Sequence, residues 1–456
     1  MNRNKKNEII LASILYQSIE TMGIKGHNKF VKERVAHTNA FFELSIKRLA
    51  RRRVAIDAAL WMYTNMAIAR KKVIKKTNIQ AGEPNPIEIR REWCLAAINF
   101  IITWLTNGIT PVFVFDGVHL DDKADTKAKR ADIKVASKAK IKALYAELNG
   151  ENGHIKDYTV PIVEELRKEL LGYTCISSED YELFKMMIKG IGIPCLNARG
   201  DGEQLCSMLC VEGKVGAVFS ADTDNLVYGC PLLITDFTFS SSYDEIGMRI
   251  PTMNCVRSDL IVSGLGITHE MYVDFCIMCG CDFNTNIPNI AAIKSFALLQ
   301  QHRSIDNLPR NLDTTCLNYQ RCREIFKYTP SEELIIKDEV IVDEKNPLFA
   351  SQEIYYPAAT STNILDINKN ALATARDYLE MAGISGQIER LIAAYNMVPA
   401  PIEGPIEGLN IPPAPRYIPP PKKIILNLRP APAQMTSVPL FPQPTVKGLT
   451  LNIIRK

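Results

Sequence analysis

The stretch PVFVFD, residues 111–116, is a continuous apolar run that ends in a carboxylate. Two other stretches have the same form, RVAID at 53–57 and GAVFSAD at 216–222. Because their apolar residues are continuous rather than alternating, each is typical of a strand buried on both faces of a sheet. Helical patterns at 92–108 and 203–214 separate these stretches, and each contains a glycine of the kind that ends helices. Strands that alternate with helices predict an α/β fold, with a parallel sheet flanked by helices.

The three predicted strands all end in an aspartate. The carboxyl ends of parallel strands form the functional crevice of an open sheet, so these aspartates should face one cleft. Further acidic residues at predicted helix starts and in adjoining loops complete the set Asp57, Asp116, Asp201, Glu203, Asp222, Asp224 and Asp282. Neighbouring carboxylates repel one another unless cations neutralise them, and such hard oxygen ligands suit magnesium or manganese. Two such ions can activate water and stabilise the leaving oxygen in phosphodiester hydrolysis.

These acidic residues also have a purely structural interpretation. Asp201 and Glu203 would cap the free N–H groups at the start of the second helical pattern. Asp222 and Asp224 would stabilise a turn by bonding to the backbone. Each residue taken alone favours this interpretation, whereas three strand-terminal acids together with two acidic pairs favour a metal-binding cleft.

A basic stripe is predicted on a helix that follows residue 118. Its cations recur at spacings of four, three, four and four residues, which places on one helix face Lys123, Lys127, Arg130, Lys134 and Lys138. Such a stripe is usually a solvated surface, but beside a metal cleft it would contact the phosphates of a nucleic acid.

Composition excludes several classes of protein. Of the 456 residues, 46% are hydrophobic and 23% charged, which argues against overall disorder, collagen and coiled coils. The twelve cysteines do not form a disulfide framework, and Cys276, Cys279 and Cys281 lack a second ligand pair at zinc spacing. Cysteines without a disulfide framework lead us to expect an intracellular protein. No run reaches the ~18 apolar residues of a membrane span, so we expect no membrane partner.

Six segments of the chain occur in the order typical of one nuclease family. They are MGIKG (22–26), VAIDAALWMY (54–63), NGITPVFVFDG (107–117), GIPCLNARGDGEQLC (192–206), SADTDNLVYG (220–229) and FCIMCGCDF (275–283). Through them, residues 22–306 resemble the flap endonuclease / XPG family of structure-specific 5′ nucleases. The resemblance implies a PIN-like parallel sheet flanked by helices, with a helical arch and a helix-hairpin (helix-two-turn-helix) module.

The resemblance also implies roles for individual residues. The ligands matched to one metal ion are Asp57, Asp116, Asp201 and Glu203, and those matched to a second are Asp222, Asp224 and Asp282. We therefore expect two Mg²⁺ ions per active site, for which Mn²⁺ can substitute. Lys123 and Arg130 match catalytic residues of the arch that reach the scissile phosphate. The expected nucleic-acid contacts are Tyr63, which the resemblance implies, and Lys127, Lys129, Lys134 and Lys294. Tyr63 would stack on a base, and its alternative role is that of a helix-core aromatic.

The chain departs from the family pattern in several places. Asp201 stands where the family has a glutamate, which is longer by a methylene. At 289–291, Asn-Ile-Ala replaces hairpin glycines that let the backbone approach duplex phosphate, which argues against such an approach here. Because 21 residues precede Met22, translation starts at Met1 or at Met22. In the segment 434–441 a serine occupies the apolar position of a sliding-clamp peptide, so we do not expect a clamp partner.

We expect five parts along the chain. They are an N-terminal extension (1–21), a nuclease core (22–265) with its arch at about 118–160, a helix-hairpin duplex-binding module (266–311), a region of uncertain fold (312–398) and a Pro-rich basic tail (399–456). The tail contains 14 of the 26 prolines and seven Lys or Arg residues against two Glu, which is typical of a flexible arm.

The expected function is that of a divalent-metal-dependent 5′ flap endonuclease or exonuclease. It would hydrolyse DNA phosphodiesters at junctions between single and double strands, in replication, repair or recombination. Two alternatives stay open, an RNA endonuclease of the same fold acting in mRNA turnover and a catalytically silent nucleic-acid-binding scaffold. We expect a monomer that binds branched or flapped DNA, or RNA in the first alternative. It would act in the nucleus, in the cytoplasm or, for a viral homologue, at a replication site in a host cell.

Overall fold

The computed structural model describes residues 24–117, 123–149, 159–243, 249–336, 364–373, 375–404 and 406–420. Predictions about the N-terminal extension, the two translation starts and the clamp-like segment lie outside these residues. The described residues as far as Pro419 belong to one compact unit, and the domain boundaries predicted inside it stay predictions.

The described strands form one mixed sheet in the order β1-β7-β6-β5-β2-β3-β4-β8. The strands are β1 (Phe41–Ser45), β2 (Arg53–Asp57), β3 (Thr110–Phe115), β4 (Cys195–Ala198), β5 (Ala217–Phe219), β6 (Leu232–Tyr243), β7 (Arg249–Arg257) and β8 (Ile335–Ile336). The five central strands pair in parallel, whereas β1, β7 and β8 add to the two sides in antiparallel pairs. The predicted α/β fold is confirmed, and the antiparallel strands at the edges are additional to the prediction.

The central strands β2 and β3 have the burial that their composition predicts. Every residue of both strands is buried. The parallel register places Asp57 opposite Val114, so the aspartate that ends β2 and Asp116, which follows β3, leave the same edge of the sheet. This edge is where the sequence places the cleft.

Helices cover both faces of the sheet. In β2, Ala55 packs into one hydrophobic core and its neighbours Val54 and Ile56 into the other, because successive side chains of a strand point to opposite faces. The α-helices are α2 (His27–Arg34), α3 (Ala58–Lys76), α4 (Pro86–Thr106), α5 (Ala124–Asn149), α6 (Thr159–Gly172), α7 (Ser178–Gly190), α8 (Gly202–Val211), α9 (Asp224–Val227), α10 (Ser258–Leu265), α11 (His269–Cys279), α12 (Ala292–His302), α13 (Tyr319–Ile325), α14 (Ser331–Leu334), α15 (Ala375–Met381) and α16 (Ile388–Asn396).

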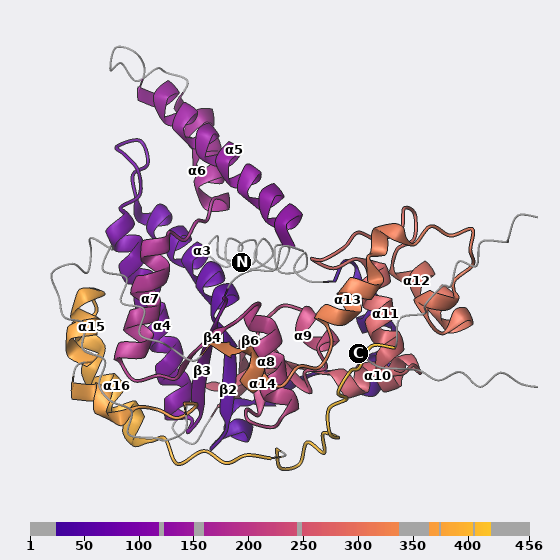
Figure 1. Ribbon diagram of the computed structural model, residues 1–456. Coiled ribbons are helices and arrows are strands. Elements are labelled where there is room, and N and C mark those ends of the chain that lie inside the picture. The colour runs from indigo at the N-terminus through magenta and orange to yellow at the C-terminus, as the bar shows by residue number, and fades with distance from the viewer. Residues whose placement is uncertain are drawn as a thin grey trace, which may run out of the picture. The chain divides into compact units, whose positions relative to one another are not determined.

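The predicted arch, at about 118–160, includes α5 and only the first residues of α6, and these two helices lie side by side in Figure 1. Ile141, Leu144 and Leu148 of α5 pack against Leu166 and Leu170 of α6 in a small hydrophobic cluster of their own. The same cluster includes residues of α3 and of the loop after it, which anchors the pair to the rest of the protein. The basic stripe of α5 is thereby held on a packed helix rather than on a free one.

The predicted tail is packed against the rest of the protein over its first part. We call residues 399–404 and 406–420 the C-terminal strap. The guanidinium of Arg52 donates from Nη1 to the carbonyls of Ile402 (3.1 Å) and Gly404 (2.9 Å). Further along, the Tyr328 N–H donates to the carbonyl of Tyr417, whose side chain is only 2% exposed. The prediction of a flexible arm from residue 399 onward is therefore wrong for the strap, because side chains and amides of distant residues bond to its backbone.

Among the described residues, no single helix is long and apolar enough to cross a membrane. The adjacent helices α10 and α11 pass the test of length and composition only as a pair, and they meet at an angle of 89°.

Candidate metal centre and nucleic-acid interface

The predicted acidic residues gather around the carboxyl edge of the central strands. Asp57 ends β2, Asp116 follows β3 and Asp222 follows β5. Asp201 comes directly before α8, and Asp224 is the first residue of α9. The side chains of Asp57 and Asp224 are only 2% and 1% exposed, so these carboxylates are withdrawn from bulk water.

Three of these carboxylates can share one ion. Single oxygens of Glu203, Asp222 and Asp224 all lie within 4.8 Å of one another. The Oδ1 atom of Asp224 is buried and has no hydrogen-bond partner among the described residues. A buried acceptor without a donor is costly, and a cation at this position would satisfy it. Because every donor atom is a carboxylate oxygen, the set fits a hard divalent cation and could bind one.

The structural and functional interpretations of these acids hold together. Asp57 accepts from the N–H of Leu60 (3.1 Å) and from Ser220 Oγ (2.9 Å), so it caps α3 while its carboxylate stays at the cleft. Asp222 Oδ1 accepts from the Asp224 N–H at 2.9 Å, which is the predicted turn. Asp201 makes no capping hydrogen bond to α8, so the cap interpretation is wrong for it. Asp57 therefore accepts through both of its oxygens, whereas the turn bond to Asp222 uses only Oδ1.

Burial and mutual repulsion raise the pKa of several of these carboxyl groups. Burial, assisted by the charge of Asp116, raises the pKa of Asp57 to about 7. Burial and the charge of Asp222 also raise the pKa of Asp224 and of Glu203 well above the ordinary range. A divalent cation favours the ionised forms, so its binding should release protons from this site.

The pKa of Asp57 predicts an unusual pH dependence for the metal-free protein. The pKa lies near 7 in the folded state against an ordinary 3.8, so the folded wild type binds the extra proton between these values. Its stability should therefore fall as the pH rises from about 4 to about 7, and Asp57→Asn, which keeps the acceptor oxygen, should remove this component. Denaturant unfolding in chelator measures the free energy of unfolding of both proteins. Relative to wild type, that of the variant should rise by on the order of a few kcal/mol across this pH window. A difference between the two proteins that stays constant with pH would contradict the assignment.

Gly202 positions Asp116. Its N–H donates to Asp116 Oδ1 at 2.7 Å, and a Cβ atom added to Gly202 would lie 2.9 Å from the same oxygen. Gly202→Ala should therefore rotate this carboxylate and weaken Mn²⁺ binding about tenfold or more, as loss of an orienting hydrogen bond does at metal sites. Calorimetric titration with Mn²⁺ measures this change. Gly200→Ala is the matched control, because an added Cβ there has no neighbour within 4 Å; equal affinity in the two variants would count against this role.

The predicted catalytic cations both approach the acidic cluster. Lys123 is 9% exposed, and its Nζ lies 3.1 Å from Asp201 Oδ2 and 3.9 Å from Glu203 Oε2. Burial alone would lower the pKa of Lys123, but the charges of Glu203, Asp201 and Asp224 raise it above its ordinary value. Arg130 of α5 is half-exposed, and its Nη2 lies 3.4 Å from Asp282 Oδ2. Asp282 is thus reached from the arch and stands outside the group of three carboxylates.

Tyr63 faces the arch from α3. Its ring is half-buried and has the Nζ of Lys134 over its face, 5.1 Å from the ring centroid. Its hydroxyl donates to the carbonyl of Thr174 at 3.4 Å. A partly exposed ring beside a cation suits contact with a base better than a place in the helix core. Lys127 and Lys129 lie on the same helix as Lys134, but their side chains are outside the described residues.

The hairpin before α12 keeps a tight turn without glycine. Asn289 has a φ of 62°, a left-handed conformation that asparagine tolerates better than most residues. The Nζ of Lys294 donates to the carbonyl of Asn289 at 3.0 Å, so this predicted phosphate contact is exposed but engaged with its own turn. Ala291 provides no side-chain cap to α12. The predicted duplex contact of Lys294 stays a prediction.

Sequence reasoning missed several residues that support the site. Ser220 donates to Asp57, and its Oγ also accepts from the Asp222 N–H at 3.1 Å. Thr223 accepts from the N–H of Ile24 at 3.0 Å, which ties the start of the described chain to the loop between two acidic residues. Both residues belong to the segment SADTD, so their closeness in sequence to Asp222 and Asp224 could have identified them as supporting residues.

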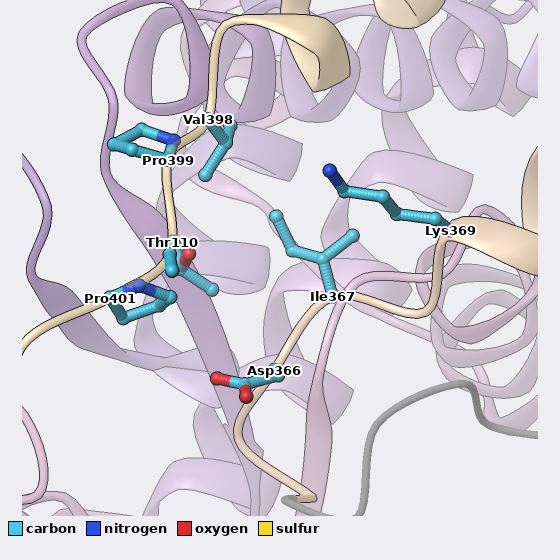
Figure 2. Close-up of a pocket in the computed structure, with 8 residues that line it drawn as sticks. Thr110, Asp366, Ile367, Lys369, Val398, Pro399 and Pro401 are labelled. Carbon is cyan, nitrogen blue, oxygen red and sulfur yellow. The ribbon is translucent and has the colours of Figure 1, made fainter.

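A cavity of about 290 Å³ lies away from this cleft (Figure 2). Its lining includes Thr110, which begins β3, and Pro399 and Pro401 of the C-terminal strap. Asp116 follows the opposite end of β3, so the cavity and the acidic cluster are at different edges of the sheet. The largely apolar lining seen in Figure 2 offers no set of metal ligands comparable to the cluster.

Comparison with known proteins places the acidic residues inside two matched regions. The XPG N-terminal domain matches residues 22–137, and the XPG I-region matches residues 192–282. Flap endonuclease 1 of Cryptosporidium muris is 31% identical over 315 residues, which are 67% of this chain and only 62% of that protein. Flap endonuclease 1 of Aedes aegypti is 31% identical over 313 residues, 67% of this chain and 75% of that protein. The solved flap endonuclease-1 from Methanococcus jannaschii aligns with a TM-score of 0.47 at 17% identity, covering 78% of this chain and 96% of that one.

Proposed function

The chain belongs to the flap endonuclease / XPG family, and we propose that its acidic cleft is the active site of a divalent-metal-dependent, structure-specific 5′ nuclease. The observation that carries the proposal is the convergence of Glu203, Asp222 and Asp224 within 4.8 Å, with a buried oxygen of Asp224 left unpartnered. The substrate would be DNA at a junction between single and double strands, as the word flap in the relatives' names suggests.

The proposed metal site uses two groups of carboxylates. Asp57, Asp116, Asp201 and Glu203 would hold one ion, and Asp222, Asp224 and Asp282 a second. Glu203 belongs to the first group but lies within 4.8 Å of Asp222 and Asp224, so the two groups meet at its carboxylate. When bound, such ions supply an activated water and stabilise the leaving oxygen. Mg²⁺ is the proposed physiological ion, with Mn²⁺ as a substitute.

The residues of the chain would bind and orient the substrate around these carboxylates. Arg130 and Lys123 would hold the scissile phosphate, since their cations are already directed toward the acidic cluster. Tyr63 would stack on a base next to the cut, with Lys134 and the rest of the basic stripe on the strand's backbone. Extruding the terminal bases toward the cleft would cost on the order of a few kcal/mol, which these contacts would offset.

Cleavage assays on matched substrates test the proposal. A labelled 5′-flap DNA, the same flap in RNA and a plain duplex DNA are offered with Mg²⁺, with Mn²⁺ and with chelator. We expect cutting of the DNA flap near its junction, dependent on the metal, with a 5′ phosphate and a 3′ hydroxyl as products. Faster cutting of the RNA flap would move the proposal to an RNA endonuclease. Tight flap binding without cleavage in either metal would favour a silent scaffold and overturn the enzymatic proposal.

The thiols support an intracellular setting for this activity. All twelve cysteines lie among the described residues, none of them forms a disulfide there, and most are buried. Free cysteines in such number are typical of proteins that work in a reducing compartment. We place the proposed activity inside a cell on this ground.

A further inference from the structure

The ammonium group of Lys123 lies within the acidic cluster, close to two of its carboxylates. The ammonium forms an ion pair with Asp201 at 3.1 Å and lies 3.9 Å from Glu203. The three side chains are 11%, 5% and 21% exposed, so the pair is screened little by solvent. An amine in this position neutralises part of the charge that a metal ion would otherwise neutralise.

An aromatic face completes the surroundings of this amine. The Nζ of Lys123 lies 4.9 Å from the ring centroid of Phe283, a distance at which the ring attracts a cation. Phe283 is buried and its ring contacts Phe326 edge-on, with centroids 5.7 Å apart, so the face is held in place. Two carboxylates and one ring therefore form a cradle for a single positive charge. The sequence pairs Phe283 directly with Asp282, another predicted metal ligand.

We propose that Lys123 is the resident counterion of the metal-free site, and that a divalent metal ion and the Lys123 ammonium compete for Asp201 and Glu203. The inference rests on the proposed function, because it takes these carboxylates as metal ligands. Binding of the metal displaces the amine, and the amine is then available to a phosphate of the substrate. Metal binding and exposure of the Lys123 amine are therefore coupled. Lys123 can bind a substrate phosphate only when the metal ion occupies the site.

Phe283 is a positioning residue in this competition. Its ring attracts the ammonium without carrying a charge. Replacing Phe283 therefore weakens the binding of the ammonium and leaves the net charge of the cleft unchanged. Phe283→Leu keeps an apolar side chain against Phe326 and removes the π face. Loss of the ring alone should therefore raise the affinity of the site for the metal ion, although less than loss of the amine itself.

Amine footprinting on the wild-type protein is the first test. The protein is treated with an acetylating N-hydroxysuccinimide ester in chelator or in saturating Mg²⁺, and each lysine is quantified by mass spectrometry. Lys123 should be protected in chelator and react at least about fivefold faster with Mg²⁺, the lower end of typical coupling between two sites. Lys214 is the matched control, since it is ion-paired to Glu212 at 3.0 Å and makes no described contact with the cluster. Equal reactivity of Lys123 in both conditions would overturn the proposal.

Titration with Mn²⁺ is the second test and distinguishes this inference from the proposed function. Lys123→Met should bind Mn²⁺ about tenfold more tightly than wild type, Phe283→Leu should show a smaller gain, and Lys214→Met should match wild type. Dissociation constants that are the same in all four proteins would overturn the competition and leave the metal site standing. Absence of Mn²⁺ binding in both wild type and Lys123→Met would overturn the metal site itself, and the inference with it.

Discussion

Asp224→Ala is expected to lower the rate of Mg²⁺-dependent cleavage of a 5′-flap DNA by about 10³-fold or more. The carboxylate of Asp224 lies with those of Glu203 and Asp222 within 4.8 Å, and its Oδ1 has no other partner among the described residues. Its removal takes a ligand from the centre of the proposed metal site, where electrostatic groups of this kind contribute several kcal/mol to transition-state stabilisation. Single-turnover cleavage of the labelled flap measures the loss.

Stability provides the control for this variant. Burial and the neighbouring charge of Asp222 raise the pKa of Asp224, so ionising this residue costs free energy in the metal-free protein. Alanine should therefore leave the melting temperature in chelator unchanged or higher, while Mg²⁺ should raise it less than in wild type. Asp377→Ala changes an exposed acid on α15 and should behave as wild type in both assays. Undiminished cleavage by a folded Asp224→Ala protein would refute the assignment of the metal site.

Arg130→Ala is expected to reduce the turnover of the flap substrate by about 10² to 10³-fold, as loss of a donor to a developing charge does in other enzymes. The guanidinium projects from α5 to within 3.4 Å of Asp282 and is half-exposed, so it can pass from that carboxylate to an incoming phosphate without being desolvated first. The effect should fall on kcat more than on KM, because the rest of the basic stripe still binds the strand.

Two variants separate position from charge in this prediction. Arg130→Lys keeps the charge but loses the bidentate geometry, so it should restore only part of the rate. Lys142→Ala removes an exposed cation more than three turns further along α5 and should change cleavage little. If Lys142→Ala lost as much activity as Arg130→Ala, the arch would act through its net charge and Arg130 would have no special role.

The central part of the fold could be predicted because its signal is local. The residues of β2 and β3 are buried on both faces, and a strand of this kind is apolar without interruption in the sequence. Parallel pairing of these strands is sufficient to bring the aspartates at their carboxyl ends close together. Asp57 and Asp116 could be placed at one edge without any knowledge of the remaining chain.

The edges of the sheet and the strap could not be predicted in this way. The two-residue strand β8 pairs with β4, and a segment that short has no periodicity to detect. The strap is proline-rich, which is typical of flexible arms, but its carbonyls accept from Arg52 and Arg257. Partners so distant along the chain leave no trace in local composition.

Lys123 shows the same limit inside the site. Its place on the basic stripe predicted a contact with phosphate, and that role remains part of the proposed function. Its pairing with Asp201 depends on how the start of α5 meets the start of α8, which no spacing in the sequence encodes. The ammonium of Lys123, which the sequence assigns to substrate binding, therefore also pairs with a carboxylate of the cleft when no substrate is bound.

The C-terminal strap has a consequence for the synthesis of the protein. Arg52 directly precedes the central strand β2, yet its guanidinium bonds to carbonyls 350 and 352 residues later in the chain. A ribosome releases the nascent polypeptide from its N-terminus, so β2 emerges long before the strap that closes over it. Loops of this length close slowly, and the unfinished base of the sheet stays open in the meantime. The last step of folding should thus be post-translational, and truncated mRNAs that end upstream of the strap should yield chains that chaperones and proteases recognise as incomplete.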